Sequence, residues 1–143
     1  MLHEIWKGLS LIFIGVLIVF SGCLGGPQNT TLYNTEVEIK EQKVATFPID
    51  IQRGYVLHIK VELIQGNVAD FVFIEEKELS NYLDMNAQYS IIERWSTLNA
   101  SGLDTQIYID TGGSYIFMVD NTQRPANGAG PHGTIKAKVL ITL

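Results

Sequence analysis

Short runs in which apolar and polar residues alternate recur through most of the chain after residue 36, and they constrain the fold more than any other feature. In the clearest run, Tyr55 to Ile64, the odd-numbered residues Tyr55, Leu57, Ile59, Val61 and Leu63 form an apolar face opposite His58, Lys60 and Glu62. Residues 103–109 and 134–143 alternate in the same way. A period of two is typical of strands that bury one face. The chain is therefore predicted to be rich in β-structure.

Two further runs, residues 69–74 and 114–120, are apolar on both faces, which predicts central strands. Pro48 favours an edge position for the strand predicted over residues 43–51, because proline cannot donate to a ladder. Residues 91–98 are predicted as another strand. Residues 75–83 are the one helical candidate, expected as a short cap over one end of the fold.

About eight short strands with one short helix and no βαβ pattern predict an all-β fold. We expect an antiparallel β-sandwich, jelly-roll-like, preceded by an N-terminal signal or anchor helix. The nucleotide-binding α/β folds are excluded by the missing βαβ units.

The first 26 residues have the order of a secretory signal. A start carrying Lys7 leads into LSLIFIGVLIVF, which has no charge, and then into SGCLGGP. This apolar stretch of residues 9–20 is shorter than the roughly 20 residues that a bilayer-spanning helix needs. An uncleaved anchor is the alternative, and it leaves the location of the domain unchanged.

The sequence Ser-Gly-Cys-Leu-Gly-Gly around Cys23 resembles a lipobox, in the form found in lipoproteins of Euryarchaeota. The resemblance implies cleavage before Cys23 and lipidation of its thiol. Two hydrocarbon chains hold a protein on a membrane, whereas one gives marginal binding. We therefore expect a signal peptide over 1–22, a lipid-anchored tether over 23–35 and a β-sandwich over 36–143, on the extracytoplasmic face of the cell membrane.

Composition excludes several classes of site. Cys23 is the single cysteine, so no intrachain disulfide and no cysteine-based metal site can form. The formal net charge is −5 and the basic residues are scattered, which argues against a nucleic-acid partner. No cofactor motif occurs, so no cofactor is predicted.

The C-terminal half resembles bacterial pre-peptidase C-terminal domains and Golgi-dynamics domains. Gly113, Tyr115, Phe117 and Asn121 match the Gly-x-Tyr-x-Phe-x-x-x-Asn strand of these families, and a polar loop leads to a final alternating strand. An earlier hairpin entry matches at Gly54, Leu57, Ile59 and Val61. The resemblance implies a jelly-roll sandwich that serves as an accessory or interaction module, and it transfers no active site.

No catalytic or metal-binding constellation is selected by spacing. His58 and His132 are far apart with no third ligand, so no metal site is predicted. Asp104, Asp110 and Asp120 are candidates for a calcium site at a sheet end, or for turn caps. No Gly-x-Ser-x-Gly motif occurs. We expect a protein that is not an enzyme, with a small hydrolase as the weakest alternative.

Three residues are candidates for contact with a partner. Tyr108 lies on the polar face of its strand, where an aromatic ring can stack on a sugar or anchor a protein; the alternative is that this ring, with its aromatic neighbours, covers the end of the core. Arg124 and His132 are the potentially cationic groups of the long Gly/Pro-rich segment 121–133, and thus natural contacts for an acidic or polar partner. The alternative is that this segment only connects two strands. Asn29 and Asn99 begin glycosylation sequons.

The sequence therefore predicts a lipid-anchored, non-catalytic binding or assembly module at the cell surface, with a protein partner in the envelope. A carbohydrate-binding module of the envelope is the alternative.

Overall fold

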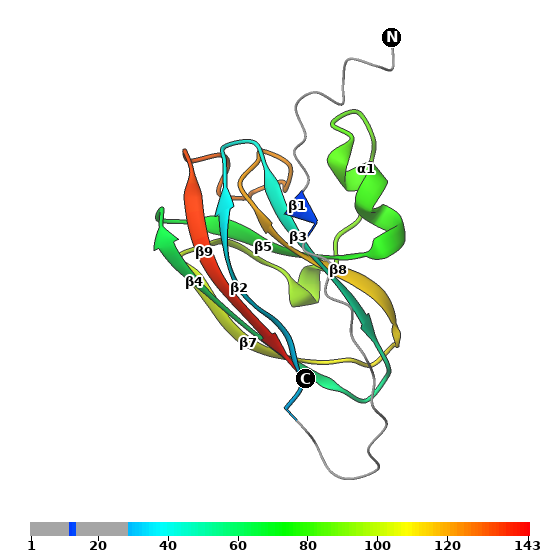
Figure 1. Ribbon diagram of the computed structural model, residues 1–143. Coiled ribbons are helices and arrows are strands. Elements are labelled where there is room, and N and C mark those ends of the chain that lie inside the picture. Colours follow the sequence, from blue (N-terminus) through cyan, green and yellow to red (C-terminus); the bar gives the residue numbers. More distant parts are fainter. Residues whose placement is uncertain (1–11, 14–28) are drawn as a thin grey trace.

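The computed structural model describes residues 12–13 and 29–143, and these residues form two packed β-sheets (Figure 1). The first sheet has the order β1-β3-β8-β5-β6 and the second β2-β9-β4-β7. The strands are β1 (Ile12–Phe13), β2 (Thr31–Ile39), β3 (Val44–Ile51), β4 (Val56–Gln65), β5 (Ala69–Glu75), β6 (Thr97–Ala100), β7 (Gly102–Tyr108), β8 (Gly113–Asp120) and β9 (Ile135–Thr142). All pairings are antiparallel except that of β1 with β3. The predicted antiparallel sandwich is confirmed.

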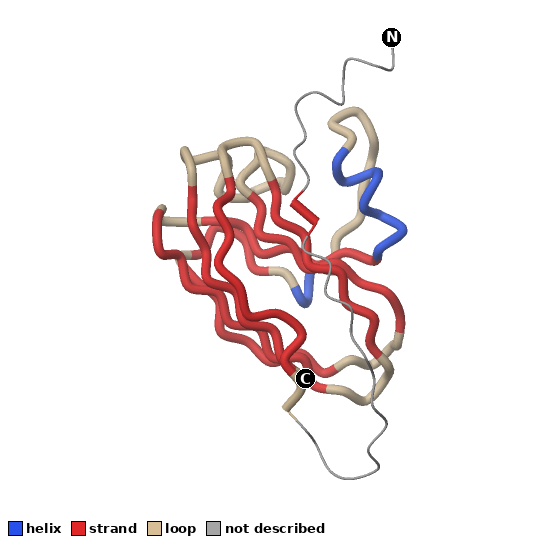
Figure 2. The backbone as a smooth tube through the Cα atoms, viewed as in Figure 1, coloured by secondary structure: helices blue, strands red, loops and turns tan. Residues whose placement is uncertain are grey.

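The two ends of the sandwich differ in what they carry. The backbone N–H of Thr30 donates to the carbonyl of Leu143 at 3.1 Å, and the N–H of Leu143 returns a bond of 2.8 Å, so β2 begins where β9 ends. We call this the tether end; it is the lower end in Figure 1. Residues 121–134 join β8 to β9 at the opposite, distal end (Figure 2).

The main core lies between the two sheets and is centred on β8. Phe117 is fully buried, and its ring lies 5.2 Å from that of Phe73, 6.0 Å from that of Phe47 and 6.5 Å from that of Phe71. β5 and β8 each have a neighbour on both sides, and their side chains are buried on both faces over most of their length. The prediction that these two strands are central is confirmed.

A second apolar cluster covers the outer face of the five-stranded sheet. The chain leaves β5 through the 3-10 helix η2 (Glu76–Glu78) into α1 (Leu79–Leu83), close to the predicted helical segment. Tyr82 of α1 packs there with Val72, Ile74 and Met118. The helix therefore covers a sheet face and not an end of the sandwich, because β5 and β8 are apolar on their outer sides and need a cover.

The β-sandwich begins earlier than the predicted boundary at residue 36. Residues 31–35 belong to β2, and Leu32 and Tyr33 are buried in the main core. Residues 31–35 pair with β9, and the Tyr33 hydroxyl donates to the carbonyl of Pro48 in β3 at 2.6 Å. Segment 31–35 is part of the domain and not of a tether.

The predicted strand over residues 91–98 is also corrected. The structure has a 3-10 turn, η3 (Glu93–Trp95), followed by β6, which begins at Thr97. The Trp95 ring packs edge-on against Phe73 at 5.8 Å and Tyr115 at 5.1 Å, so this residue belongs to the main core without lying in a strand. A strand was predicted here because a short turn that buries one aromatic residue has the same apolar composition as a strand.

The expected N-terminal helix falls almost wholly outside the described residues. The two that are described, Ile12 and Phe13, form β1 in place of helix, and they pair with Ala45 and Thr46 of β3. Pro48 lies beyond this pairing, where β8 is the one partner of β3 among the residues that the structure describes, as expected for proline. Within the described residues, no helix is long and apolar enough to cross a membrane.

Candidate functional site

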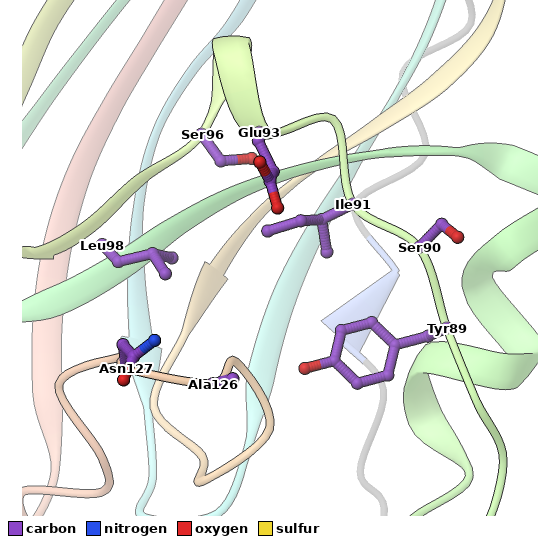
Figure 3. A pocket seen from close by; sticks show the side chains of 8 residues that line it. All are labelled: Tyr89, Ser90, Ile91, Glu93, Ser96, Leu98, Ala126 and Asn127. Carbon is purple, nitrogen blue, oxygen red and sulfur yellow. The ribbon is translucent and has the colours of Figure 1, made fainter.

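A cleft of about 580 Å³ lies on the outside of the five-stranded sheet, between the segment that precedes β6 and the loop 121–134 (Figure 3). We call it the loop cleft. Its lining residues come from these two stretches and from β6: Tyr89, Ser90, Ile91, Glu93, Ser96, Leu98, Ala126 and Asn127.

The lining combines aliphatic side chains with a few polar groups. Ile91 and Leu98 belong to the second apolar cluster and supply the apolar part, and Glu93 is the one charged residue of the lining. No ion pair is recorded for the Glu93 carboxylate among the described residues. Tyr89, Ser90, Glu93, Ser96 and Asn127 supply polar groups, so the cleft is of mixed character and offers both apolar contact and hydrogen bonding to a bound partner.

The loop that forms one wall of the cleft is held at its base by Asn121, which is buried. The Asn121 side-chain amide donates to the carbonyls of Ile39 at 3.2 Å and Gly133 at 2.6 Å, and its oxygen accepts from the N–H of His132 at 3.1 Å. One side chain therefore joins the two ends of the loop to each other and to β2.

Arg124 fixes the middle of the loop to the helical segment. Its guanidinium donates to five backbone carbonyls: Tyr82 at 2.8 Å, Asn81 at 2.9 Å, Asp84 at 2.7 Å, Ala87 at 2.6 Å and Met85 at 3.3 Å. The guanidinium also stacks on Tyr89 at 4.3 Å, and the Tyr89 hydroxyl donates to the carbonyl of Arg124 at 2.5 Å. The cation thus satisfies carbonyls at the C-terminus of α1, which a helix leaves without partners.

Two buried carboxylates complete the attachment of the loop. Asp70 of β5 lies directly opposite Asp120 of β8, and both are fully buried. Asp70 accepts from the N–H groups of Asn99 at 2.8 Å and Ala129 at 2.9 Å. Asp120 accepts from the N–H of Thr122 at 2.6 Å and from the Tyr82 hydroxyl. Each carboxylate therefore ties the loop or its neighbours to the sheet.

Burial changes the acidity of this cluster. Desolvation raises the pKa of Asp120 above its ordinary value, and the hydrogen bonds from Tyr82 and Thr122 offset part of that rise. Burial, with the nearby Asp120 charge, raises the pKa of the Tyr82 hydroxyl as well, so Tyr82 stays a donor. Glycine is required at position 128, because a Cβ there would run into the Asp70 carboxylate.

The predicted binding residues do not come together. The Arg124 guanidinium is occupied by carbonyls of the chain, so it is not a free contact for an acidic partner. His132 is exposed, with its ring Nε2 2.7 Å from the carbonyl of Ala129. Tyr108 is 59% exposed, on the outer face of the other sheet.

The three aspartates proposed for calcium are also separate. Asp104 lies 2.7 Å from the His58 ring, and Asp110 lies 3.0 Å from Arg94, whereas Asp120 is in the buried cluster. The bond to His58 lowers the pKa of Asp104. Within residues 12–13 and 29–143, no three metal-ligating side chains gather.

A smaller cleft of about 220 Å³ separates the edge strands β6 and β7 beside Tyr108. Its other aromatic residue, Trp95, is 8% exposed and has Arg94 stacked on its ring at 4.9 Å. This leaves Tyr108 as the one open ring that lines this cleft.

Both sequon asparagines are accessible, whereas Cys23 lies outside the described residues. Asn29 precedes β2, and Asn99 lies in β6 with a positive φ of 53°. Both are exposed.

Sequence reasoning missed Asp70 and Glu93, and it named Asn121 only as part of a strand motif, with no role in holding the loop. A signal existed for Asp70, because it is a charged residue inside a run predicted to be buried on both faces, and such a residue needs partners.

No protein-family model matches the chain, and no curated protein matches it. Among solved structures the chain is similar to PliG, a periplasmic inhibitor of g-type lysozyme from Aeromonas hydrophila, with 11% identity, a TM-score of 0.48 and coverage of 80% of this chain and 86% of that one. It is also similar to the pre-peptidase C-terminal domain of a Bacillus anthracis collagenase, with 18% identity, a TM-score of 0.41 and coverage of 74% and 88%. These likenesses concern the fold alone.

Proposed function

We propose that this protein is a lipid-anchored, extracytoplasmic, non-catalytic module that binds a protein partner in the loop cleft. The observation that carries the proposal is the attachment of the loop: Asn121, Arg124 and the two buried aspartates fix one conformation of a segment that needs only to connect two strands. A long loop in a compact domain is usually either functional or disordered, and the hydrogen bonds that fix this loop favour a function.

A fixed loop favours binding because less conformational entropy is lost when the partner arrives. The aliphatic side chains of Ile91 and Leu98 supply the apolar contact of such an interface, and Glu93 supplies a charge that suits a basic group of the partner. No general base and nucleophile are paired in the cleft, which is the reason for proposing binding and not turnover.

The anchor is tested at Cys23. We expect the mature protein to carry two hydrocarbon chains on residue 23 by intact mass, and we expect Cys23→Ser to leave the membrane fraction or remain uncleaved. An unmodified thiol on membrane-bound mature protein would exclude lipidation.

The binding site is tested by filling the cleft. Ala126 lines the cleft and is exposed, so Ala126→Trp should block it without disturbing the core. Gln123→Trp is the matched control, because Gln123 is exposed in the same loop but does not line the cleft. We expect Ala126→Trp to lose the partner that wild type and Gln123→Trp capture from native membranes. Equal capture by both variants would contradict the proposed site.

A further inference from the structure

Three large apolar side chains are exposed together at the tether end of the sandwich. Tyr55 is 46%, Val56 45% and Tyr108 59% exposed. Val56 lies directly opposite Tyr108 across β4 and β7, and the carbonyl of Tyr55 accepts from the N–H of Ile109 at 2.9 Å. We call these three residues the rim patch. Val56 and Tyr108 share the outer face of the sheet, and Tyr55 lies beside them at its end. Exposed apolar side chains gathered in this way mark a surface that contacts something other than water.

The patch is confined to that end of the sheet. Leu57 and Ile107 point into the core, so Val56 and Tyr108 point outward. The next outward pair along the same two strands is His58 with Gln106, followed by Lys60 with Asp104, and the His58 ring lies 2.7 Å from Asp104. The rim patch is therefore followed directly by polar side chains on the same outer face, which we call the polar wall.

The proposed anchor leads to this same end. Thr30 is seven positions after Cys23, so the chain between them spans at most about 25 Å. Thr30 is paired with Leu143 at the tether end, in the sheet order β2-β9-β4-β7. Because neighbouring strands lie about 4.8 Å apart, Tyr108 is only about 15 Å from the start of β2.

We infer that the rim patch rests in the interface of the membrane to which Cys23 is attached, an inference that depends on the proposed lipid anchor. Tyrosine suits this position, because its ring enters the boundary of the acyl region while its hydroxyl stays hydrated. The polar wall of His58, Gln106, Lys60 and Asp104 then faces the headgroups and water. The loop 121–134 lies at the distal end, away from the membrane, where it can meet a partner (Figure 1).

The chain offers a matched pair of positions for a test. Val56 and Ile64 lie on the same outward face of β4, are 45% and 50% exposed, and stand at opposite ends of the strand. At about 3.3 Å per residue they are roughly 26 Å apart. Lipidated mature protein has no free thiol at Cys23, so Val56→Cys or Ile64→Cys gives a single site for a thiol-reactive fluorophore.

Each labelled variant is used as the mature protein that begins at Cys23. It is reconstituted in vesicles made from the polar lipids of the cells that express it, with and without a nitroxide-labelled lipid. We expect the nitroxide lipid to quench the fluorophore at position 56 and to leave the fluorophore at position 64 unchanged. Intact mass reports lipidation of Cys23 in the same samples.

The outcomes separate the two proposals. A lipidated Cys23 with equal quenching at both positions would overturn the rim contact and keep the anchor. A free Cys23 thiol with neither position quenched would overturn both. Self-quenching at position 56 without nitroxide lipid would identify a second copy of the chain as the occupant and would overturn membrane contact.

Discussion

Removal of the Arg124 side chain should destabilise the protein more than removal of any other arginine that the structure describes. Arg124→Ala deletes the donors that satisfy the carbonyls of Asn81, Tyr82, Asp84 and Ala87, at distances of 2.6–2.9 Å. It also removes the cation from the Tyr89 ring. The carbonyls lie at the end of α1 and in the turn after it, so both α1 and the loop 121–134 lose their attachment.

The magnitude follows from the geometry. Three of the four close carbonyls contact Nη2, which has two hydrogens, so about three good bonds exist at once. A hydrogen bond from a charged donor contributes about 1.5–3 kcal/mol, and solvent lowers this for a half-buried group. A cation over an aromatic ring adds about 0.5–2 kcal/mol. Because these contributions are not additive, we expect a total loss of about 2–4 kcal/mol.

The assay is urea unfolding of a fragment of residues 29–143, which contains every buried core residue that the structure describes. Arg124→Lys should recover less than half of the loss, because one ammonium cannot reach carbonyls arranged around a planar fork. Arg94→Ala is the matched control: Arg94 also stacks on an aromatic ring and pairs with Asp110 at 3.0 Å, but it is exposed. We expect about 1 kcal/mol or less for the control. Equal losses for Arg124→Ala and Arg94→Ala would refute the argument.

Three further changes test the core and the buried cluster. Phe117→Ala should cost about 3–5 kcal/mol in urea unfolding, because the fully buried ring contacts three other phenylalanines; a loss below about 1 kcal/mol would show that β8 is not central. Gly128→Ala should destabilise the protein through contact with the Asp70 carboxylate, and Gly130→Ala gives a comparison with open space around the new methyl group but a strained φ of +73°. The pKa of Asp120 is raised on folding. Between the unfolded and folded pKa values, the native state therefore binds more protons than the unfolded state. The contribution of Asp120 to stability consequently falls as the pH rises through that window. Asp120→Asn should remove this pH dependence, and parallel stability curves for wild type and variant from pH 4 to 8 would show that the carboxyl is not perturbed.

The strands were predictable where one side chain in two faces the core. The alternation of residues 55–64 allows only one choice of buried face. A shift of the register by one residue would expose the aliphatic side chains and bury Lys60 and Glu62. The start of β2 was not predictable in the same way. Threonine and asparagine surround Leu32 and Tyr33, and only the pairing with β9 shows that these two side chains are buried.

The site was less predictable than the fold because it depends on contacts between distant segments. The sequence marked Arg124 as a cation in a Gly/Pro-rich loop, which is typical of a solvent-exposed contact. Its acceptors are carbonyls of residues 81–87, about forty positions away, and backbone carbonyls leave no trace in a sequence. The same holds for the cleft, because its walls come from segments about thirty positions apart that the five-stranded sheet brings together.

The buried polar groups also explain how a chain with a single cysteine fixes a long loop. A disulfide is impossible, and a Gly/Pro-rich segment has too few apolar side chains to hold itself in place by packing. Buried carboxylates are costly unless every acceptor is satisfied, and Asp70 and Asp120 find those donors only when the backbone of the loop takes one path. Their burial therefore selects one loop conformation over others of similar compactness. That conformation forms the wall of the cleft without any partner. In the proposed function, the polar cluster therefore acts on binding through the loop and does not touch the partner.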